Sequence, residues 1–333
     1  MIRNFFLCLC LFISSTLFGQ IGGKHAFEFL NIPGNARLSA LGGVNASRGG
    51  DINFFQSNPS LLTDSMDNNA SLSYRIMPAD IGLMNLSYAI DFKGAGIFSI
   101  GIHHVDYGTI HGYDAAGTET GNFNAGETAI FIGKVHKIRH FRIGANIKTV
   151  FSNVAGYRSS AIITDLGGAF EHPSGRLMVG LVIKNLGIIL SDYTETSAST
   201  LPFDVQAGVT VKPEHMPLRF SFTAHNLTQP DITYHDPGSS VKAPRTLDKV
   251  LRHFNLAAEI LIHRNFNVLA GYNFLVHQDL KLETTGGGAG FTVGIAVRVK
   301  SFELILSRGT YVVGNAGYAF TLTSDFNRLL KRR

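Results

Sequence analysis

Cysteine is almost absent from this chain of 333 residues, and the only two, Cys8 and Cys10, lie close to its start. Residues 1–19 are typical of an export signal, because Arg3 precedes an apolar run that ends in small residues. A run this short does not make a stable membrane anchor. Removal of this segment leaves a mature chain without thiols, which excludes disulfides and cysteine chemistry.

Charge is scarce as well. Charged residues make up 16% of the chain against 45% hydrophobic residues, which excludes a disordered protein. The net charge of +5 is too small to argue for nucleic-acid binding. After the export signal, no stretch of about eighteen apolar residues predicts a transmembrane helix. Tryptophan is absent, so any aromatic belt at a membrane surface must come from the 25 Phe and 10 Tyr.

Large apolar residues alternate with small or polar ones along most of the chain. In residues 141–148, Phe, Ile, Ala and Ile fall on one face, and Arg, Gly, Asn and Lys fall on the other. Residues 266–274 and 291–300 repeat the pattern. A period of two indicates β-strands. One apolar and one polar face favour a sheet closed around water or a polar plug over a dry core.

Fourteen segments carry this alternation, and most span ten residues or more. A tilted strand needs about 9–11 residues to cross a bilayer, whereas strands of soluble sheets are mostly about 5–6 residues long. The sequence therefore predicts an all-β protein, an antiparallel transmembrane β-barrel of about fourteen strands over residues 67–326. The predicted strands are 68–77, 81–91, 96–104, 127–138, 141–153, 159–171, 176–187, 203–212, 218–227, 254–263, 266–275, 289–299, 302–308 and 313–323.

Short and long connections alternate between these strands, which is typical of periplasmic turns and outer loops. The short ones are 139–140, 172–175, 263–265 and 300–301, and the long ones are 105–126, 187–202, 228–253 and 276–288. We therefore expect the outer membrane of a Gram-negative bacterium, with the loops facing the cell surface. The basic residues predicted at the periplasmic rim are Lys93, Lys137, Arg139, Arg142, Arg176, Lys212, Arg219, Arg264, Arg298 and Lys300, followed by a basic periplasmic tail over 327–333.

Residues 20–66 precede the first strand and lack its alternation. Residues 35–41 predict a short helix that ends at Gly42-Gly43, and the segment carries many apolar anchors, among them Phe54 and Phe55. Because fourteen strands enclose a lumen that would leak if empty, we expect this segment to be a hatch inside the barrel.

The hatch also carries a recognisable pattern. It begins with the run Phe29-Leu30-Asn31-Ile32-Pro33 and continues with six further residues. Together they resemble the N-terminal signature of the PorV/PorQ branch of FadL-like outer-membrane barrels. The hatch signature consists of Arg37, Gly42, Gly43, Asp51, Asn58 and Pro59. The strand ends 184–187 and 225–228 are similar to a recurring Asn-Leu-Gly of that family. Within the branch, the short chain is most similar to the PorQ members.

This resemblance implies a component of the type IX secretion system of Bacteroidetes-like bacteria. It implies docking of a PorZ-like surface protein, in an attachment complex with PorU-like and PorV-like members. Two alternatives stay open: a FadL-like transporter of a hydrophobic small molecule, and a PorV-like shuttle of secreted cargo. No mid-strand proline predicts the kink of a lateral opening, which weakly disfavours transport.

The sequence offers no catalytic, cofactor or metal motif, so we expect a non-enzymatic protein. His103 and His104 are neighbours on a strand and point to opposite faces. Ser221 and His225 share a face but lie roughly 13 Å apart at ~3.3 Å per residue, too far for a nucleophile and its base. Aromatic residues on polar outer loops often bind protein partners, and these are Tyr107, Tyr113, Phe123, Tyr193 and Tyr234.

Overall fold

A computed structural model describes residues 25–233, 245–280, 288–312 and 315–330. The predicted export signal, residues 20–24 of the predicted hatch and Tyr234 lie outside these described residues.

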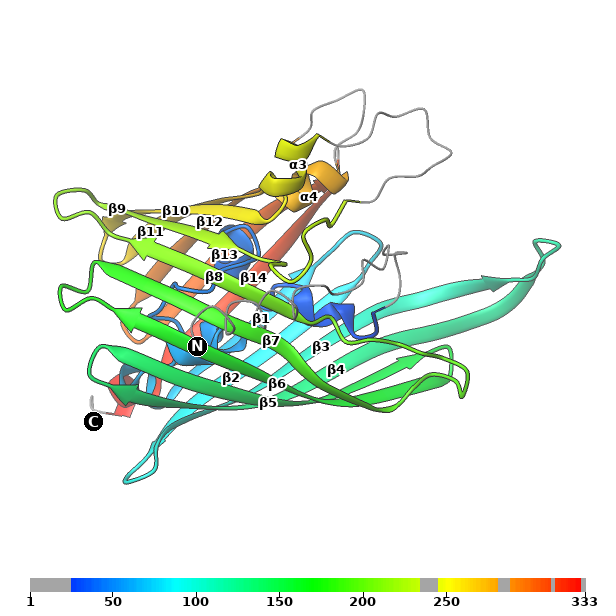
Figure 1. The fold of residues 1–333 in the computed structure, drawn as a ribbon, viewed down its shortest axis with the longest axis horizontal. Helices are drawn as coiled ribbons and strands as arrows, with labels where there is room; N and C mark the ends of the chain where they lie inside the picture. The colour runs from blue at the N-terminus through cyan, green and yellow to red at the C-terminus, as the bar shows by residue number, and fades with distance from the viewer. Residues whose placement is uncertain (1–24, 234–244, 281–287, 313–314, 331–333) are drawn as a thin grey trace, which may run out of the picture.

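Fourteen antiparallel strands form a closed barrel, as the alternation predicts (Figure 1). Each strand pairs with its neighbours along the chain, and the barrel closes where β1 pairs with β14, from Asn69 opposite Asp325 to Ile76 opposite Tyr318. The strands are β1 (Asn69–Ile76), β2 (Gly82–Phe92), β3 (Gly96–Tyr113), β4 (Glu119–Ile138), β5 (Phe141–Val154), β6 (Tyr157–Glu171), β7 (Leu177–Ser191), β8 (Asp204–Val211), β9 (Leu218–Ala224), β10 (Phe254–His263), β11 (Phe266–Asn273), β12 (Phe291–Val299), β13 (Phe302–Val312) and β14 (Asn315–Asp325).

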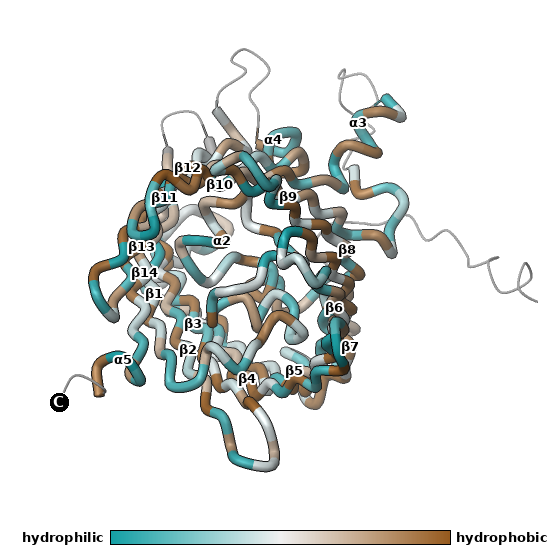
Figure 2. The backbone as a smooth tube through the Cα atoms, turned by 90° about the vertical axis from the view of Figure 1, so that its left-hand side faces the viewer, coloured by the Kyte–Doolittle hydropathy of each residue, from teal (hydrophilic) through white to brown (hydrophobic). Residues whose placement is uncertain are grey.

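The wall has its polar side inward and its apolar side outward. On β5, Ile143 and Ile147 face outward with 60% and 58% of their surface exposed, whereas Asn146 and Lys148 face inward and are buried. A view along the barrel shows the hatch, including the short helix α2 (Ala36–Ala40), inside the ring of strands (Figure 2). Among the described residues, no helix is long and apolar enough to span a membrane.

The hatch is a chain of short turns and helices. Its elements after residue 25 are η1 (Glu28–Asn31), α2, η2 (Ile52–Gln56), η3 (Pro59–Leu61) and η4 (Asp64–Met66). The predicted helix over 35–41 is confirmed: the Asn35 side chain accepts a bond from the Leu38 amide at the start of α2, and Gly42 and Gly43 end it with positive φ angles of 85° and 86°.

The hatch contacts opposite sides of the wall. Helix α2 packs on β11 to β14, while η3 packs on β4, β5 and β6. The apolar side chains that the sequence predicted as anchors are buried between hatch and wall, with Phe54 and Leu61 fully buried in one cluster and Phe29 and Phe55 in another. These side chains pack with inward apolar residues of the wall, such as Leu83 in one cluster and Leu269 in the other.

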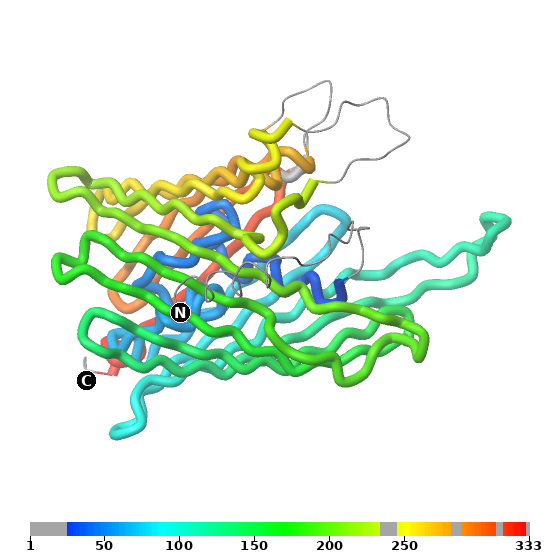
Figure 3. The backbone as a smooth tube through the Cα atoms, viewed as in Figure 1, coloured from blue at the N-terminus to red at the C-terminus, as the bar shows by residue number. Residues whose placement is uncertain are grey.

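One predicted loop is largely strand. Residues 105–126 were expected to connect two strands of ordinary length, but β3 and β4 continue to Tyr113 and from Glu119, so their hairpin projects far beyond the barrel (Figure 3). The prediction was wrong because the turn chemistry lies only at Asp114, whose carboxylate accepts bonds from the amides of Ala116 and Thr118. The β-prone Thr, Ile and Tyr before it continue the ladder.

Three further boundaries differ from the predictions. The predicted loop 228–253 contains helix α3 (Thr246–Leu251), and helix α4 (Phe274–Leu280) replaces the end of a predicted strand and the start of a predicted loop. The predicted basic tail begins as helix α5 (Phe326–Leu330), where Asn327 donates to the Asp67 carbonyl at 3.0 Å. Short helices of this kind lack the two full turns that would make a helical period visible.

The outward apolar face generates a first test. Replacing Ile147 by Arg should destabilise the folded barrel by about 2–4 kcal/mol, since an outward charge near mid-strand must leave water for hydrocarbon. Urea titration of folding into phospholipid vesicles measures the change. Ala116→Arg at the exposed tip of the β3–β4 hairpin adds the same charge outside the bilayer and should fold like the parent. Equal stability of both variants would show that lipid does not cover this face.

Candidate functional site

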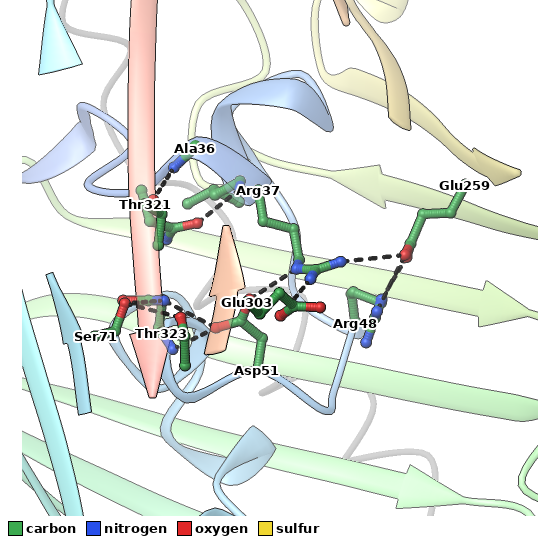
Figure 4. A network of polar contacts seen from close by, with 12 residues as sticks. Ala36, Arg37, Arg48, Asp51, Ser71, Glu259, Glu303, Thr321 and Thr323 are labelled. Atoms are coloured by element: carbon green, nitrogen blue, oxygen red, sulfur yellow. Dashed lines mark hydrogen bonds and ion pairs between the residues drawn. The ribbon is translucent and has the colours of Figure 1, made fainter. Parts of the chain in front are cut away.

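The hatch signature is organised around Arg37. Its Nε donates to Asp51 at 2.7 Å, and its Nη2 lies 2.9 Å from the carboxylate of Glu303 on β13 (Figure 4). Burial lowers the pKa of Arg37, but the carboxylates of Glu303, Asp51 and Glu259 outweigh burial and raise it. The guanidinium therefore stays charged inside the barrel.

Glu259 on β10 joins Arg37 to two further cations. It accepts from Arg48 of the hatch in a two-pronged ion pair, and from Arg219 on β9 at 3.1 Å, while Arg37 Nη1 lies 3.7 Å away. We call Arg37, Arg48, Asp51, Arg219, Glu259 and Glu303 the hatch ion network. Its members come from the hatch and from three wall strands, so it ties the plug to one side of the barrel.

Sequence reasoning found two members of this network and missed the others. The signature contained Arg37 and Asp51, but Glu259 and Glu303 were not singled out, and Arg219 was assigned to the periplasmic rim. The available signal was a lone carboxylate on the polar face of a strand: Glu259 follows the inward residues Asn255 and Ala257 at the period of two. Such a carboxylate requires a cation inside the lumen.

The predicted rim charges divide into two groups. Arg142, Arg219 and Arg298 turn toward carboxylates of the wall, Arg142 to Glu171 at 2.6 Å and Arg298 to Glu303 at 3.1 Å. Arg142 also donates to the Ser60 carbonyl of the hatch at 3.0 Å. Arg142 and Arg219 are therefore lumen residues as well as end-of-strand residues, whereas the side chain of Arg298 is exposed at the end of the barrel.

Amide and hydroxyl side chains of the wall bind the hatch backbone directly. Asn255 donates to the carbonyls of Leu41 and Val44 at 2.8 and 2.7 Å, and Asn273 donates to that of Gly42 at 2.9 Å. On the opposite side, Asn146 donates to the Phe55 carbonyl at 2.7 Å. These bonds satisfy carbonyls that the short hatch helices leave without intrahelical partners.

The wall receives the hatch at inward-facing glycines. A Cβ on Gly271 would lie 2.2 Å from the Gly42 nitrogen, and one on Gly180 would lie 2.1 Å from the Ala46 oxygen. On β5 and β6, Gly144 and Gly167 meet Pro59 and Asn58 in the same way, at 2.5 and 2.0 Å. The signature pair Asn58-Pro59 thus starts η3 where two wall strands lack side chains.

A cavity of about 300 Å³ lies between the hatch and the wall. Within the described part of the chain, five buried polar atoms on its lining lack hydrogen-bond partners: Asn45 Nδ2, Asn53 Oδ1, His103 Nε2, Asp204 Oδ1 and His225 Nε2. Buried polar atoms of this kind bind water or a polar molecule. Lys184 and Gln206 add to this polar lining, which makes the cavity a poor site for a hydrocarbon.

The described residues contain no group of three or more His, Cys, Asp or Glu side chains that could hold a metal ion. His103 and His104 lie as the alternation predicts, His103 buried inside and His104 on the other face, bonded to Thr128. Ser221 bonds to Thr210 at 2.8 Å.

Two of the predicted partner-binding aromatics are turned into the barrel. Tyr107 donates to Glu127 at 2.6 Å, and Tyr193 donates to Ser152 at 2.6 Å, so neither ring is free on an outer loop. Tyr113 and Phe123 lie on the projecting β3–β4 hairpin, where Tyr113 is 63% exposed. The four described aromatics therefore form two separate groups: Tyr107 and Tyr193 lie inside the barrel, and Tyr113 and Phe123 lie on the hairpin.

Comparisons with known proteins place the fold. No protein-family model matches the chain, and no curated protein matches it either. Solved structures do: the toluene transporter TbuX of Ralstonia pickettii has a TM-score of 0.54 at 12% identity, covering 88% of this chain and 99% of its own. The fold is that of the FadL-like outer-membrane barrels.

Two further barrels show the same likeness. A Pseudomonas aeruginosa FadL homologue has a TM-score of 0.50 at 10% identity, and the deltaS2 mutant of the TodX monoaromatic hydrocarbon channel has 0.52 at 12%. Each covers 88% of this chain and 98% of its own. At 10–12% identity, these likenesses show a shared barrel fold.

The ion network generates a second test. Glu259→Gln removes the shared carboxylate and leaves three arginines without it, which should weaken the seating of the hatch by about 3–5 kcal/mol. We expect faster proteolysis within residues 25–66 and a measurable ion conductance in planar bilayers. Glu214→Gln is the matched control, because Glu214 binds both terminal nitrogens of Arg176 on the exposed surface. Similar behaviour of the two variants would contradict a structural role of the buried network.

The glycine contacts generate a third. Gly42 and Gly94 both have positive φ, 85° and 88°, but only at Gly42 would a Cβ collide, 2.0 Å from Asn255 Oδ1. Alanine in the left-handed region costs about 1–2 kcal/mol at either position. Gly42→Ala should therefore lower the midpoint of urea unfolding clearly more than Gly94→Ala. Equal shifts would mean that the turn after α2 does not sit against Asn255 of β10 as described.

Proposed function

We propose that this protein is a non-enzymatic outer-membrane barrel that docks a surface protein. The proposal rests on one observation about how the molecule is divided. A hatch that contacts opposite walls fills the lumen, and a long β-hairpin projects from the end of the barrel that lies opposite the short turns. A barrel of this build presents a surface, whereas a route through its centre is blocked by buried ion pairs.

The partner follows from the hatch signature. Its resemblance to the PorV/PorQ branch supports a role in type IX secretion, with a PorZ-like protein as the docked partner and PorU-like and PorV-like proteins in the same attachment complex. The contacts of Arg37, Asp51, Asn58 and the glycine pair show that these residues hold the hatch in the barrel. That structural role would be the same with any partner. The resemblance, not the geometry, therefore supports the PorZ-like assignment.

A second function has a specific observation in its favour. Strand β7 continues to Ser191, but its pairing with β8 ends at Lys184 opposite Asp204, and β6 and β7 shift register between Thr164 and Leu166. Residues 192–203, which follow this half of β7, form none of the barrel strands. A transporter that passes a hydrophobic molecule sideways into the membrane would use such an interruption, as the FadL-like fold permits. The polar cavity speaks against this route.

Binding to a purified PorZ-like protein from the same organism tests docking. We expect the detergent-solubilised barrel to retain it, and replacement of residues 228–252 by a short Gly-Ser turn to weaken retention at least tenfold. The barrel should still close, because β9 and β10 pair up to Ala224 opposite Phe254. Replacing the short turn 172–175 is the control and should leave retention unchanged.

Other outcomes decide between the alternatives. Uptake of toluene by vesicles that contain the barrel, without retention of the PorZ-like protein, would favour the transporter. Retention of secreted cargo in place of the PorZ-like protein would favour the shuttle. Either result would overturn the docking proposal.

A further inference from the structure

The projecting hairpin is a two-stranded ribbon without neighbours. Strand β2 pairs with β3 only as far as Gly82 opposite Asp106, and β5 pairs with β4 only as far as Val154 opposite Ala125. Beyond these points, residues 109–113 pair only with residues 119–124 (Figure 3). We call this segment the β3–β4 ribbon.

Both edges of the ribbon are open beyond Asn124, whose carbonyl accepts a hydrogen bond from the Ala155 amide. Between two register shifts, four consecutive pairs are regular, from Thr109 opposite Asn124 to Gly112 opposite Gly121. Each strand of a regular pair turns half of its backbone N–H and C=O groups away from its partner. No other strand pairs with these edges within the described residues, so the groups form a template for a further strand.

The usual protection against such pairing is missing. Natural sheets block open edges with Lys, Pro or a covering segment, yet residues 107–124 contain neither Lys, Arg nor Pro. A two-stranded ribbon in water is only marginally stable by itself, and a third strand adds both a ladder and side-chain packing. Ile110 and Phe123 are directly opposite each other and offer apolar side chains for that packing.

Charge narrows the choice of partner. Asp106, Asp114 and Glu119 are the only charged residues between Val105 and Gly126, apart from titratable His111, so the ribbon is acidic. Two copies of the ribbon would bring like charges together, which disfavours self-pairing. A neutral or basic extended segment meets no such repulsion.

We propose that the surface partner docks by adding an extended, uncharged or basic β-segment to an edge of the β3–β4 ribbon. The inference rests on the proposed docking function and names the structural mode of that docking. Backbone hydrogen bonds supply the affinity, and the exposed side chains of Ile110 and Tyr113, with the half-buried Phe123, select the sequence of the added strand.

The test uses two lysine variants with the same added charge. His111→Lys places a lysine in the centre of the regular pairs, and Ala116→Lys places one at the exposed turn. With the full-length barrel in detergent and the purified PorZ-like protein as probe, we expect His111→Lys to weaken binding at least tenfold and Ala116→Lys to change it less than twofold. Unchanged mobility of both variants on heating in a denaturing gel confirms that the barrel has assembled.

Amide hydrogen exchange gives a readout that side-chain contact would not move. In the complex, amides of residues 109–112 or 121–123 should exchange at least tenfold more slowly, and replacement of residues 110–123 by a two-residue turn, which keeps Tyr107 in the barrel, should abolish binding. Wild-type binding without this protection, or equal binding by His111→Lys, overturns the ribbon inference and leaves docking through other loops standing. Failure of the wild-type barrel to bind the probe overturns the proposed docking function and the ribbon inference together.

Discussion

The structure depends on one constraint: a wall that is apolar outside must satisfy every polar group that it turns inward. The closed ladder pairs the strand backbones, but it leaves Arg, Lys, Asn and carboxylate side chains facing the lumen. Water alone could solvate them only in a wide channel. Here the hatch supplies the partners, and Arg37 and Arg48 meet the carboxylates of Glu259 and Glu303. Hatch and wall are therefore parts of one electrostatic arrangement.

The same constraint explains a further ion pair of the lumen. Lys148 lies 2.6 Å from Asp165 and donates to Asn185 at 2.6 Å. Asn185 has a positive φ of 60° and its amide donates to Asp165, so the irregular step between β6 and β7 is held by a buried charge pair. Specific polar contacts thus stabilise the interrupted part of the wall as well as the regular part.

Much of this fold is predictable from the sequence, and the failures have physical causes. The period of two gave the strand number because only lipid outside and polar groups inside produce it over so many segments. The hatch helix followed from Asn35 and Gly42-Gly43, whose cap roles are local. Glu259 and Glu303 were missed because their partners are remote in sequence. The β3–β4 ribbon was missed because exposed strands alternate too weakly to be separated from loops.

The outer surface was the least predictable part for a related reason. In the sequence, nothing distinguishes Tyr107 and Tyr193 from Tyr113. In the structure, a carboxylate binds Tyr107 and a hydroxyl binds Tyr193 inside the barrel. Whether a tyrosine near a strand end turns inward depends on such partners. Outside the barrel, Lys249 binds Asp231 at 2.5 Å and lowers the pKa of that carboxyl to about 2, so the contact between α3 and its loop is lost only in strong acid.

Because of the glycines in the wall, the wall and the hatch do not tolerate mutation equally. Where the hatch backbone lies against Gly144, Gly180 and Gly271, any side chain on the wall would occupy space that the hatch main chain already fills, and at Gly167 it would occupy the space of the Asn58 side chain. Hatch side chains that point elsewhere can vary without altering that fit. Sequence drift in this protein is therefore restricted most severely at wall residues that have no side chain at all.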